Sequence, residues 1–132
     1  DEQLRACGVS GNKVLALRDL ARREAAGEIP LARQLQYLSN ERIIETLVPT
    51  RGVGRWTVEM MLMFRLGRPD VLPIDDLGIR KGIQLLDGLD AMPAPKDLPE
   101  RAARWSPYQT MASFYLWRIA DFRKTPVKRS QD

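Results

Sequence analysis

The 132-residue sequence contains no histidine and a single cysteine, Cys7. Without histidine the chain cannot form a Ser-His or Cys-His nucleophile pair or a His-ligated metal centre, and it lacks the commonest proton carrier near neutral pH. One thiol is too few for an internal disulfide, a cysteine-rich zinc site or a cysteine-ligated iron–sulfur cluster, and this pattern suits a reducing intracellular compartment. Many hydrolase and metalloenzyme chemistries are therefore excluded.

Long apolar runs are also missing. No segment approaches the roughly 20 apolar residues that a membrane-spanning helix needs, and the acidic start Asp1-Glu2 is not a secretory signal. Hydrophobic residues at 44% and charged residues at 29% are typical of a soluble globular protein, and the length fits one domain. The net charge of +4 is compatible with a polyanionic partner such as nucleic acid, although a surface of mixed charges explains it equally well.

Apolar residues recur at helical spacing and no β-like alternation persists, so the sequence predicts an all-α bundle of short helices. Ser39 and either Asp75 or Asp76 stand where helix N-caps are expected, and Ser106-Pro107 has the form of a cap plus a first-turn proline. The predicted helices cover residues 10–27, 31–38, 40–47, 55–66, 77–86 and 107–123, with a turn-rich loop at 87–99. The helix over residues 55–66 is apolar enough that we expect it to be buried.

A glycine-rich turn, Gly52-Val53-Gly54, joins two of these helices. Glycine lets a backbone approach a phosphate closely, and the N–H groups of the turn and of the next helix N-terminus favour an anion. Arg51 and Arg55 add positive charge at the same corner. The pattern therefore predicts a phosphate-binding hairpin, although a tight helix–helix connection without a ligand also explains an isolated Gly-x-Gly.

Three ordered motifs extend this pattern over most of the chain. They are Gly52-Val53-Gly54-Arg55-Trp56-Thr57, then Asp70-Val71-Leu72-Pro73 with Asp76-Leu77-Gly78-Ile79-Arg80, and then Trp105-x-Pro107-Tyr108 with Tyr115-Leu116-Trp117-Arg118. In this order they resemble the helix-hairpin-helix DNA glycosylases, and most nearly the 3-methyladenine DNA glycosylase II family. The resemblance implies an all-α helical bundle with a helix-hairpin-helix motif, the C-terminal part of a DNA glycosylase fold, over residues 1–123, followed by a basic tail at residues 124–132.

The implied activity is that of a monofunctional DNA glycosylase of base excision repair. Such an enzyme hydrolyses the N-glycosidic bond of flipped alkylated bases, of the 3-methyladenine type, in duplex DNA and leaves an abasic site. Bond breaking builds positive charge on the sugar, so an ionised carboxylate beside C1′ stabilises the transition state. By resemblance Asp76, directly before Leu77-Gly78, is the catalytic residue. Taken without the resemblance, Asp75 or Asp76 can simply be a helix cap.

The residue at position 56 indicates whether the enzyme only removes the base or also cuts the DNA strand. Members of the superfamily that also cut the DNA strand carry a lysine two positions after the second hairpin glycine, and this lysine forms a Schiff base with the sugar. Here that position holds Trp56. The resemblance therefore implies hydrolysis of the base by water without strand cleavage.

Aromatic side chains are expected to hold the flipped base by stacking and cation–π contact. The substrate-binding residues that the resemblance implies are Trp56, Met60, Trp105 and Tyr108. Met60 stands where related enzymes can have a stacking tyrosine. Tryptophan and tyrosine at helical spacing also commonly fill cores, and Tyr115 and Trp117 are predicted to do so.

The resemblance assigns the hairpin to DNA binding and to a bound cation. The implied DNA-binding residues are Thr50, Arg51, Gly52, Val53, Gly54, Arg55 and Thr57. A structural Na⁺ or K⁺ would be held by the backbone carbonyls of Val48, Thr50 and Val53, and no other cofactor is expected. The expected partner is duplex DNA with alkylated bases, in the cytoplasmic nucleoid of a bacterium or in the nucleus of a eukaryote.

The family's N-terminal helices, with the segment that wedges into the duplex, have no counterpart in this sequence. Three explanations are open: a fragment of a larger glycosylase, which we favour, a separate chain that supplies the missing part, or a minimal variant without full activity. Two other functions remain open, a non-catalytic helix-hairpin-helix DNA-binding module and a helical protein-interaction bundle. The enzyme alone needs Asp76 and the aromatic residues, whereas both DNA-binding hypotheses predict salt-sensitive affinity.

Overall fold

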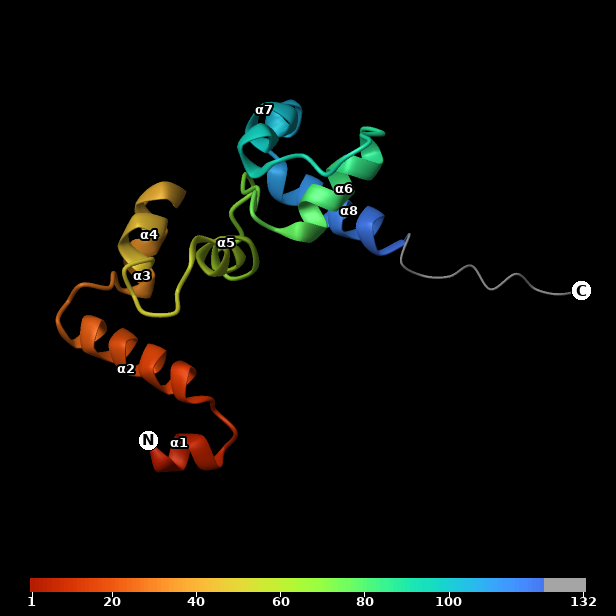
Figure 1. Ribbon diagram of the computed structural model, residues 1–132. Coiled ribbons are helices and arrows are strands. Elements are labelled where there is room, and N and C mark those ends of the chain that lie inside the picture. The colour runs from red at the N-terminus through yellow and green to blue at the C-terminus, as the bar shows by residue number, and fades with distance from the viewer. Residues whose placement is uncertain (123–132) are drawn as a thin grey trace, which may run out of the picture. The chain divides into compact units, whose positions relative to one another are not determined.

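The computed structural model describes residues 1–122, and the secondary structure of these residues is entirely helical. They divide into two compact units, the first ending at Leu62 and the second beginning at Met63, so the division falls inside helix α5. Figure 1 shows the helices of both units. The predicted all-α class is thus confirmed, and the predicted basic tail at residues 124–132 lies outside the described residues. No helix among residues 1–122 is long and apolar enough to cross a membrane.

The first unit contains α1 to α4 and most of α5. Their bounds are α1 Glu2–Ala6, α2 Gly11–Ala25, α3 Ala32–Leu35, α4 Asn40–Leu47 and α5 Arg55–Phe64. Ser39 caps α4 as predicted, since its Oγ accepts a hydrogen bond from the Arg42 N–H at 3.2 Å. The helix predicted over residues 31–38 is shorter, because the chain turns after α3 to enter this cap. The buried apolar side chains of the unit come from α2, α4 and α5, and include Val14, Ile43, Ile44, Val58 and Leu62.

The second unit is built around α6 and α8, which lie side by side (Figure 1). The bounds are α6 Leu77–Leu86, α7 Leu98–Ala102 and α8 Gln109–Phe122, with 3₁₀ turns η1 Pro95–Asp97 and η2 Ala103–Trp105. Its core consists of Ile79, Ile83, Leu98 and Leu116. The loop predicted at residues 87–99 therefore contains η1 and the start of α7. Pro95 and Pro99 stand in the first turns of these elements, where proline is compatible with a helix.

The prediction that Ser106-Pro107 opens the last helix is wrong, because α8 begins at Gln109. Asp70 supplies the cap from a distant part of the chain. Its Oδ1 accepts a hydrogen bond from the Gln109 N–H at 3.2 Å, and its Oδ2 accepts one from the Ser106 hydroxyl at 2.7 Å. The carboxylate of Asp70 thus ties the segment before α6 to the start of α8.

Two glycines of α6 allow α8 to approach closely. A Cβ at Gly82 would lie 2.4 Å from the backbone oxygen of Leu116, and a Cβ at Gly78 would lie 2.7 Å from Cδ1 of Trp117. Both distances are too short for non-bonded atoms. The helices therefore meet backbone to backbone at Gly82, and an indole ring fits against Gly78.

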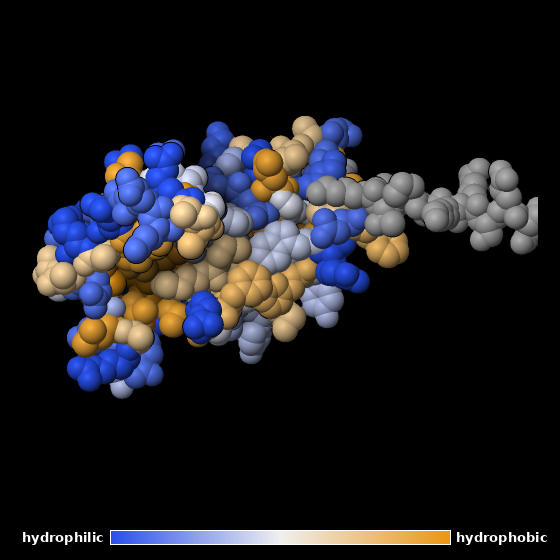
Figure 2. All heavy atoms as spheres, turned by 90° about the horizontal axis from the view of Figure 1, so that it is seen from below, coloured by the Kyte–Doolittle hydropathy of each residue, from blue (hydrophilic) through white to orange (hydrophobic). Residues whose placement is uncertain are grey.

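Apolar side chains remain exposed on both units, interspersed with charged ones (Figure 2). Phe64, at the end of the helix predicted to be buried, is 60% exposed, and Tyr115, predicted to be core, is 65% exposed. In the middle of the same helix, Leu62 and Met63 are buried as predicted. A continuous apolar run thus identifies a helix with a buried face, but some of its residues still face outward.

Replacing Gly82 by alanine should destabilise the protein. Because the new Cβ would meet backbone rather than a movable side chain, we expect the free energy of unfolding to fall by about 2 kcal/mol. The measurement is urea unfolding followed by far-ultraviolet circular dichroism. Gly11→Ala is the control, since no atom lies within 4 Å of its Cβ position. Equal stability of the two variants would contradict the backbone contact.

Candidate functional site

Residues 48–54, the hairpin, connect α4 to α5, and two internal hydrogen bonds shape them. The Thr50 N–H donates to the Leu47 carbonyl and the Val53 N–H donates to the Thr50 carbonyl, each at 3.0 Å. Gly52 has a φ of +74°, which residues with a Cβ rarely adopt. The turn therefore requires glycine at this position.

Two backbone donors of the hairpin remain for a ligand. The N–H groups of Gly52 and Gly54 make no hydrogen bond to any residue in the described part of the chain, and both glycines are exposed. Gly54 directly precedes α5, whose first N–H groups and dipole favour an anion at the same end. This is the arrangement that a phosphate-binding hairpin requires.

The two arginines beside the hairpin differ. Arg55 binds Glu41 through two hydrogen bonds of 2.8 and 3.0 Å and donates a third, of 3.1 Å, to Glu59. The Arg55 guanidinium lowers the pKa of the Glu41 carboxyl, and in return Glu41 raises the pKa of Arg55. The exposed side chain of Arg51 forms no ion pair with any residue from 1 to 122. Arg51 is therefore the arginine whose charge stays available to a ligand.

Thr50 is enclosed in the first unit. Its side chain is 2% exposed and lines an apolar pocket, so it presents no donor to a surface ligand. Its carbonyl accepts the Val53 N–H, whereas the carbonyls of Val48 and Val53 accept no hydrogen bond from the described residues. Backbone carbonyls suit Na⁺ or K⁺, so the donor type fits the expected cation. Thr57 is exposed in the first turn of α5.

Asp76 is the N-cap of α6 and is held from two sides. Its Oδ1 accepts one hydrogen bond from the Ile79 N–H at 2.9 Å and another from the indole N–H of Trp117 at 2.8 Å. The neighbouring Asp75 is exposed at the surface. Of the two aspartates that could cap this helix, Asp76 is the cap, and its carboxylate is the one with a set orientation.

Trp117 is a residue whose contact with Asp76 was not predicted. Its ring stacks on Phe64, with centroids 6.1 Å apart and planes 13° apart, and lies 6.0 Å from the ring of Phe114. A Cβ at Gly78 would lie 3.1 Å from Asp76 Oδ1 as well as 2.7 Å from the indole. Gly78 thus leaves the space in which the indole reaches the carboxylate. A glycine inside a predicted helix, two positions after Asp76, was the signal for this close approach.

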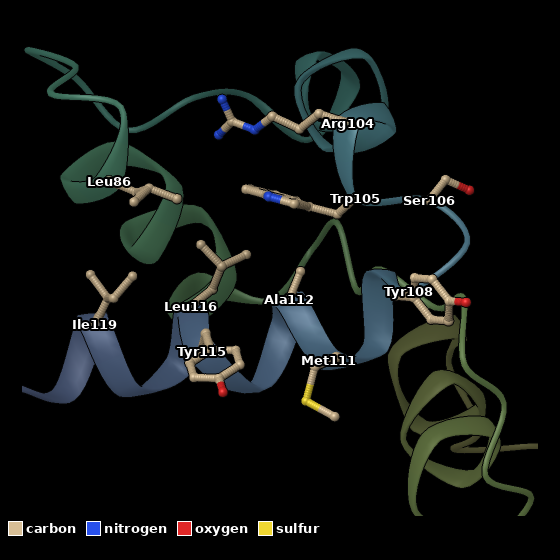
Figure 3. A pocket seen from close by; sticks show the side chains of 10 residues that line it. All are labelled: Leu86, Arg104, Trp105, Ser106, Tyr108, Met111, Ala112, Tyr115, Leu116 and Ile119. Atoms are coloured by element: carbon tan, nitrogen blue, oxygen red, sulfur yellow. The ribbon is translucent and has the colours of Figure 1, made fainter.

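Trp105 and Tyr108 line a pocket of about 490 Å³ in the second unit (Figure 3). Arg104 lies over the Trp105 ring, 4.4 Å from its centroid, and the ring also packs against the core. Tyr108 is 68% exposed. Asp76 is not among the residues that line this pocket. The structure therefore brings Trp105 and Tyr108 together but places Asp76 with Trp117 instead.

Trp56 and Met60 belong to the first unit. Trp56 is 48% exposed in the first turn of α5, and Met60 is partly buried one turn later.

Among residues 1–122 there is no group of three or more histidine, cysteine, aspartate or glutamate side chains that could hold a metal ion.

Comparison with known proteins identifies the family. The HhH-GPD superfamily of base excision DNA repair proteins matches residues 1–107. DNA-3-methyladenine glycosylase 1 of Schizosaccharomyces pombe is 42% identical over 130 residues, which cover 96% of this chain and 57% of that relative. The structure of 3-methyladenine DNA glycosylase from the same organism, in complex with abasic DNA, matches with a TM-score of 0.79 and 42% identity over 89% of this chain and 57% of that one.

A second solved structure, DNA-3-methyladenine glycosidase from Bacillus halodurans, matches with a TM-score of 0.84 and 36% identity over 94% of this chain and 57% of that one. The chain thus spans little more than half the length of these relatives. The three sequence motifs, the helical fold and the family match agree. The chain belongs to the HhH-GPD superfamily of base excision DNA repair proteins.

Proposed function

We propose that this chain is a monofunctional DNA glycosylase of the 3-methyladenine type, which removes alkylated bases from duplex DNA and leaves abasic sites. The observation that carries the proposal is the carboxylate of Asp76, held by the Ile79 N–H and the Trp117 indole in a chain of this superfamily. The names of the relatives support the substrate class, and one relative was solved on abasic DNA.

The hairpin is the proposed phosphate contact. The N–H groups of Gly52 and Gly54 can donate to phosphate oxygens, and Arg51 adds a positive charge that is not cancelled by an ion pair within residues 1–122. Such contacts position a duplex without reading its sequence. This suits a repair enzyme, which must find a damaged base in any sequence context.

Asp76 is the proposed electrostatic catalyst. As the N-glycosidic bond breaks, its electron pair leaves with the base, and positive charge develops at C1′ of the sugar. The two donors to Asp76 Oδ1 are neutral, so neither cancels the negative charge that stabilises this cation. Water then adds to C1′ and releases its proton. An alkylated base already carries positive charge and departs neutral, so no general acid is required.

Asp76→Asn should abolish base release while retaining the fold and DNA binding. An amide oxygen can still accept the Ile79 N–H, but the negative charge is lost, so we expect release from methylated duplex DNA at low salt to fall by about 100-fold or more. Strand breaks are scored only after alkali. Asp75→Asn, the matched control, should release base like the parent. Full activity of Asp76→Asn would contradict the catalytic role.

Trp117→Phe should slow base release without weakening DNA binding. Phenylalanine can keep the ring contacts with Phe64 and Phe114 but cannot donate to Asp76. Loss of a hydrogen bond that orients a charged group predicts a fall of about 10-fold in the single-turnover rate. Duplex affinity, measured by fluorescence anisotropy, should stay unchanged. A parent-like rate would show that the indole N–H is not needed to orient the carboxylate.

Borohydride should trap no covalent adduct between the chain and DNA. Trp56 occupies the position at which a Schiff-base lysine would stand, and an indole cannot form an imine with the sugar. The reaction is run on methylated duplex DNA with sodium borohydride and resolved on a denaturing gel. A strand-cleaving glycosylase that uses lysine is the positive control. A trapped adduct of this chain would overturn the monofunctional assignment.

The proposed cation at the hairpin is Na⁺ or K⁺, held by the backbone carbonyls of Val48, Thr50 and Val53. The carbonyls of Val48 and Val53 accept no hydrogen bond within the described residues, which leaves their lone pairs for such an ion. A bound monovalent cation would supply positive charge next to the phosphate. The turn itself is already shaped by the Val53 N–H bond to Thr50.

The alternative is a DNA-binding module without chemistry. It needs the Gly52 and Gly54 donors but not Asp76, so the base-release assay separates the two functions. If the parent chain and Asp76→Asn both bind duplex DNA and neither releases base, the binding module is the correct assignment for these 132 residues.

A further inference from the structure

One face of α2 contacts the hairpin at three successive points, all within the first unit. Ala16, Asp19 and Arg23 are spaced three and four residues apart, so they share this face. A Cβ at Gly52 would lie 3.1 Å from the Cβ of Ala16. Asp19 Oδ2 accepts a hydrogen bond from the Arg51 N–H at 2.8 Å.

Arg23 contacts the hairpin at Pro49 and also binds Asp19, so the contacts of these two side chains with the hairpin are linked. Its Nη2 donates to the Pro49 carbonyl at 3.0 Å, and its Nε donates to Asp19 Oδ2 at 3.1 Å. The backbone of Pro49 and of Arg51 is thus fastened to α2 through a single carboxylate–guanidinium pair. Both side chains are 21% exposed, so the pair is largely shielded from water.

Asp19 is an unusual residue to find beside a phosphate-binding turn. Its negative charge would repel DNA, yet the Arg51 N–H, Arg22 and Arg23 all bind it and hold the pKa of its carboxyl far below the usual range. The carboxylate is therefore ionised at neutral pH. Its position needs a reason other than charge attraction to DNA.

We propose that Asp19 is a positioning residue for DNA binding: by accepting the Arg51 N–H it sets the path of the hairpin so that Gly52 and Gly54 present their N–H groups to the same phosphate backbone. This inference rests on the proposed DNA-binding function of the hairpin. Asp19 takes the Arg51 N–H, whereas the N–H groups of Gly52 and Gly54, one and three positions later, make no hydrogen bond to a described residue. The donor bound to α2 is therefore followed by two donors that are left for DNA.

Charge and positioning predict opposite results for Asp19→Ala, which makes the test sharp. Removing a negative charge near DNA should tighten binding if charge alone matters. Loss of positioning should instead weaken binding to duplex DNA by about 10-fold. The plot of log affinity against log salt concentration should also become less steep, by about 0.9, which is the change in slope expected for the loss of one phosphate contact. The affinity of the 132-residue chain for an undamaged duplex is measured by anisotropy over a range of salt concentrations.

Glu24→Ala is the matched control. Glu24 is exposed on the same helix, and its carboxylate makes no ion pair with a described residue, so this variant changes the net charge equally without touching the hairpin. It should bind as tightly as the parent or slightly tighter, with an unchanged salt slope. Asp19→Asn should restore most of the affinity lost in Asp19→Ala, because its amide oxygen can still accept the Arg51 N–H.

Amide hydrogen exchange, followed by NMR on the unsubstituted chain, keeps the inference testable if Asp19→Ala does not fold. The Arg51 N–H should exchange slowly with and without DNA, whereas the N–H groups of Gly52 and Gly54 should become protected only when duplex DNA is added. Rapid exchange at Arg51 in the free protein, or parent-like binding by Asp19→Ala, would overturn the role of Asp19 and leave the proposed function standing. A parent chain that binds no duplex would overturn both.

Discussion

The close approach of α6 and α8 is the constraint on which the geometry of the candidate carboxylate depends. At Gly82 the two helices meet with no side chain between them, and one turn earlier Gly78 leaves space for the indole of Trp117. Because the indole can enter this space, its N–H reaches Asp76 Oδ1 at 2.8 Å. A larger residue at either glycine would separate the helices and remove the second donor. The orientation of one carboxylate is thus set by the packing of two helices.

An aspartate carboxylate that joins distant segments through hydrogen bonds occurs at three places in the chain. Asp19, Asp70 and Asp76 each accept one hydrogen bond from a backbone N–H and at least one more from a side chain. In each case the carboxylate joins segments that are more than 30 residues apart, since the separations are 32, 39 and 41 residues. A domain of this size has a small core, and buried or half-buried carboxylates add contacts of defined direction that apolar packing does not supply.

The long-range hydrogen bonds of these aspartates explain which features could be predicted from the sequence and which could not. The Ser39 cap, the glycine-rich turn and a cap at Asp75 or Asp76 were accessible, because each depends on residues within a few positions of one another. The catalytic candidacy of Asp76 came instead from the resemblance of three ordered motifs to a known family. The start of α8 was not accessible, since its cap is Asp70, and neither was the contact of Trp117 with Asp76. Long-range partners of a carboxylate leave no local pattern. The exposure of Phe64 and Tyr115 was mispredicted for a related reason, because an apolar count does not say which face of a helix is covered.

The three aspartates differ in the charge of the hydrogen-bond donors named above, and this difference bears on what each can do. Asp19 is bound by two arginines, which offset its charge and leave it a structural role at the hairpin. The hydrogen bonds of Asp70 come from a hydroxyl and an amide at the capped end of α8. The donors to Asp76 Oδ1 are likewise neutral, so they orient its carboxylate without cancelling its charge. In the proposed function, the two neutral donors fix the direction of the Asp76 carboxylate, and a carboxylate fixed in this way stabilises a developing sugar cation without having to reorient first.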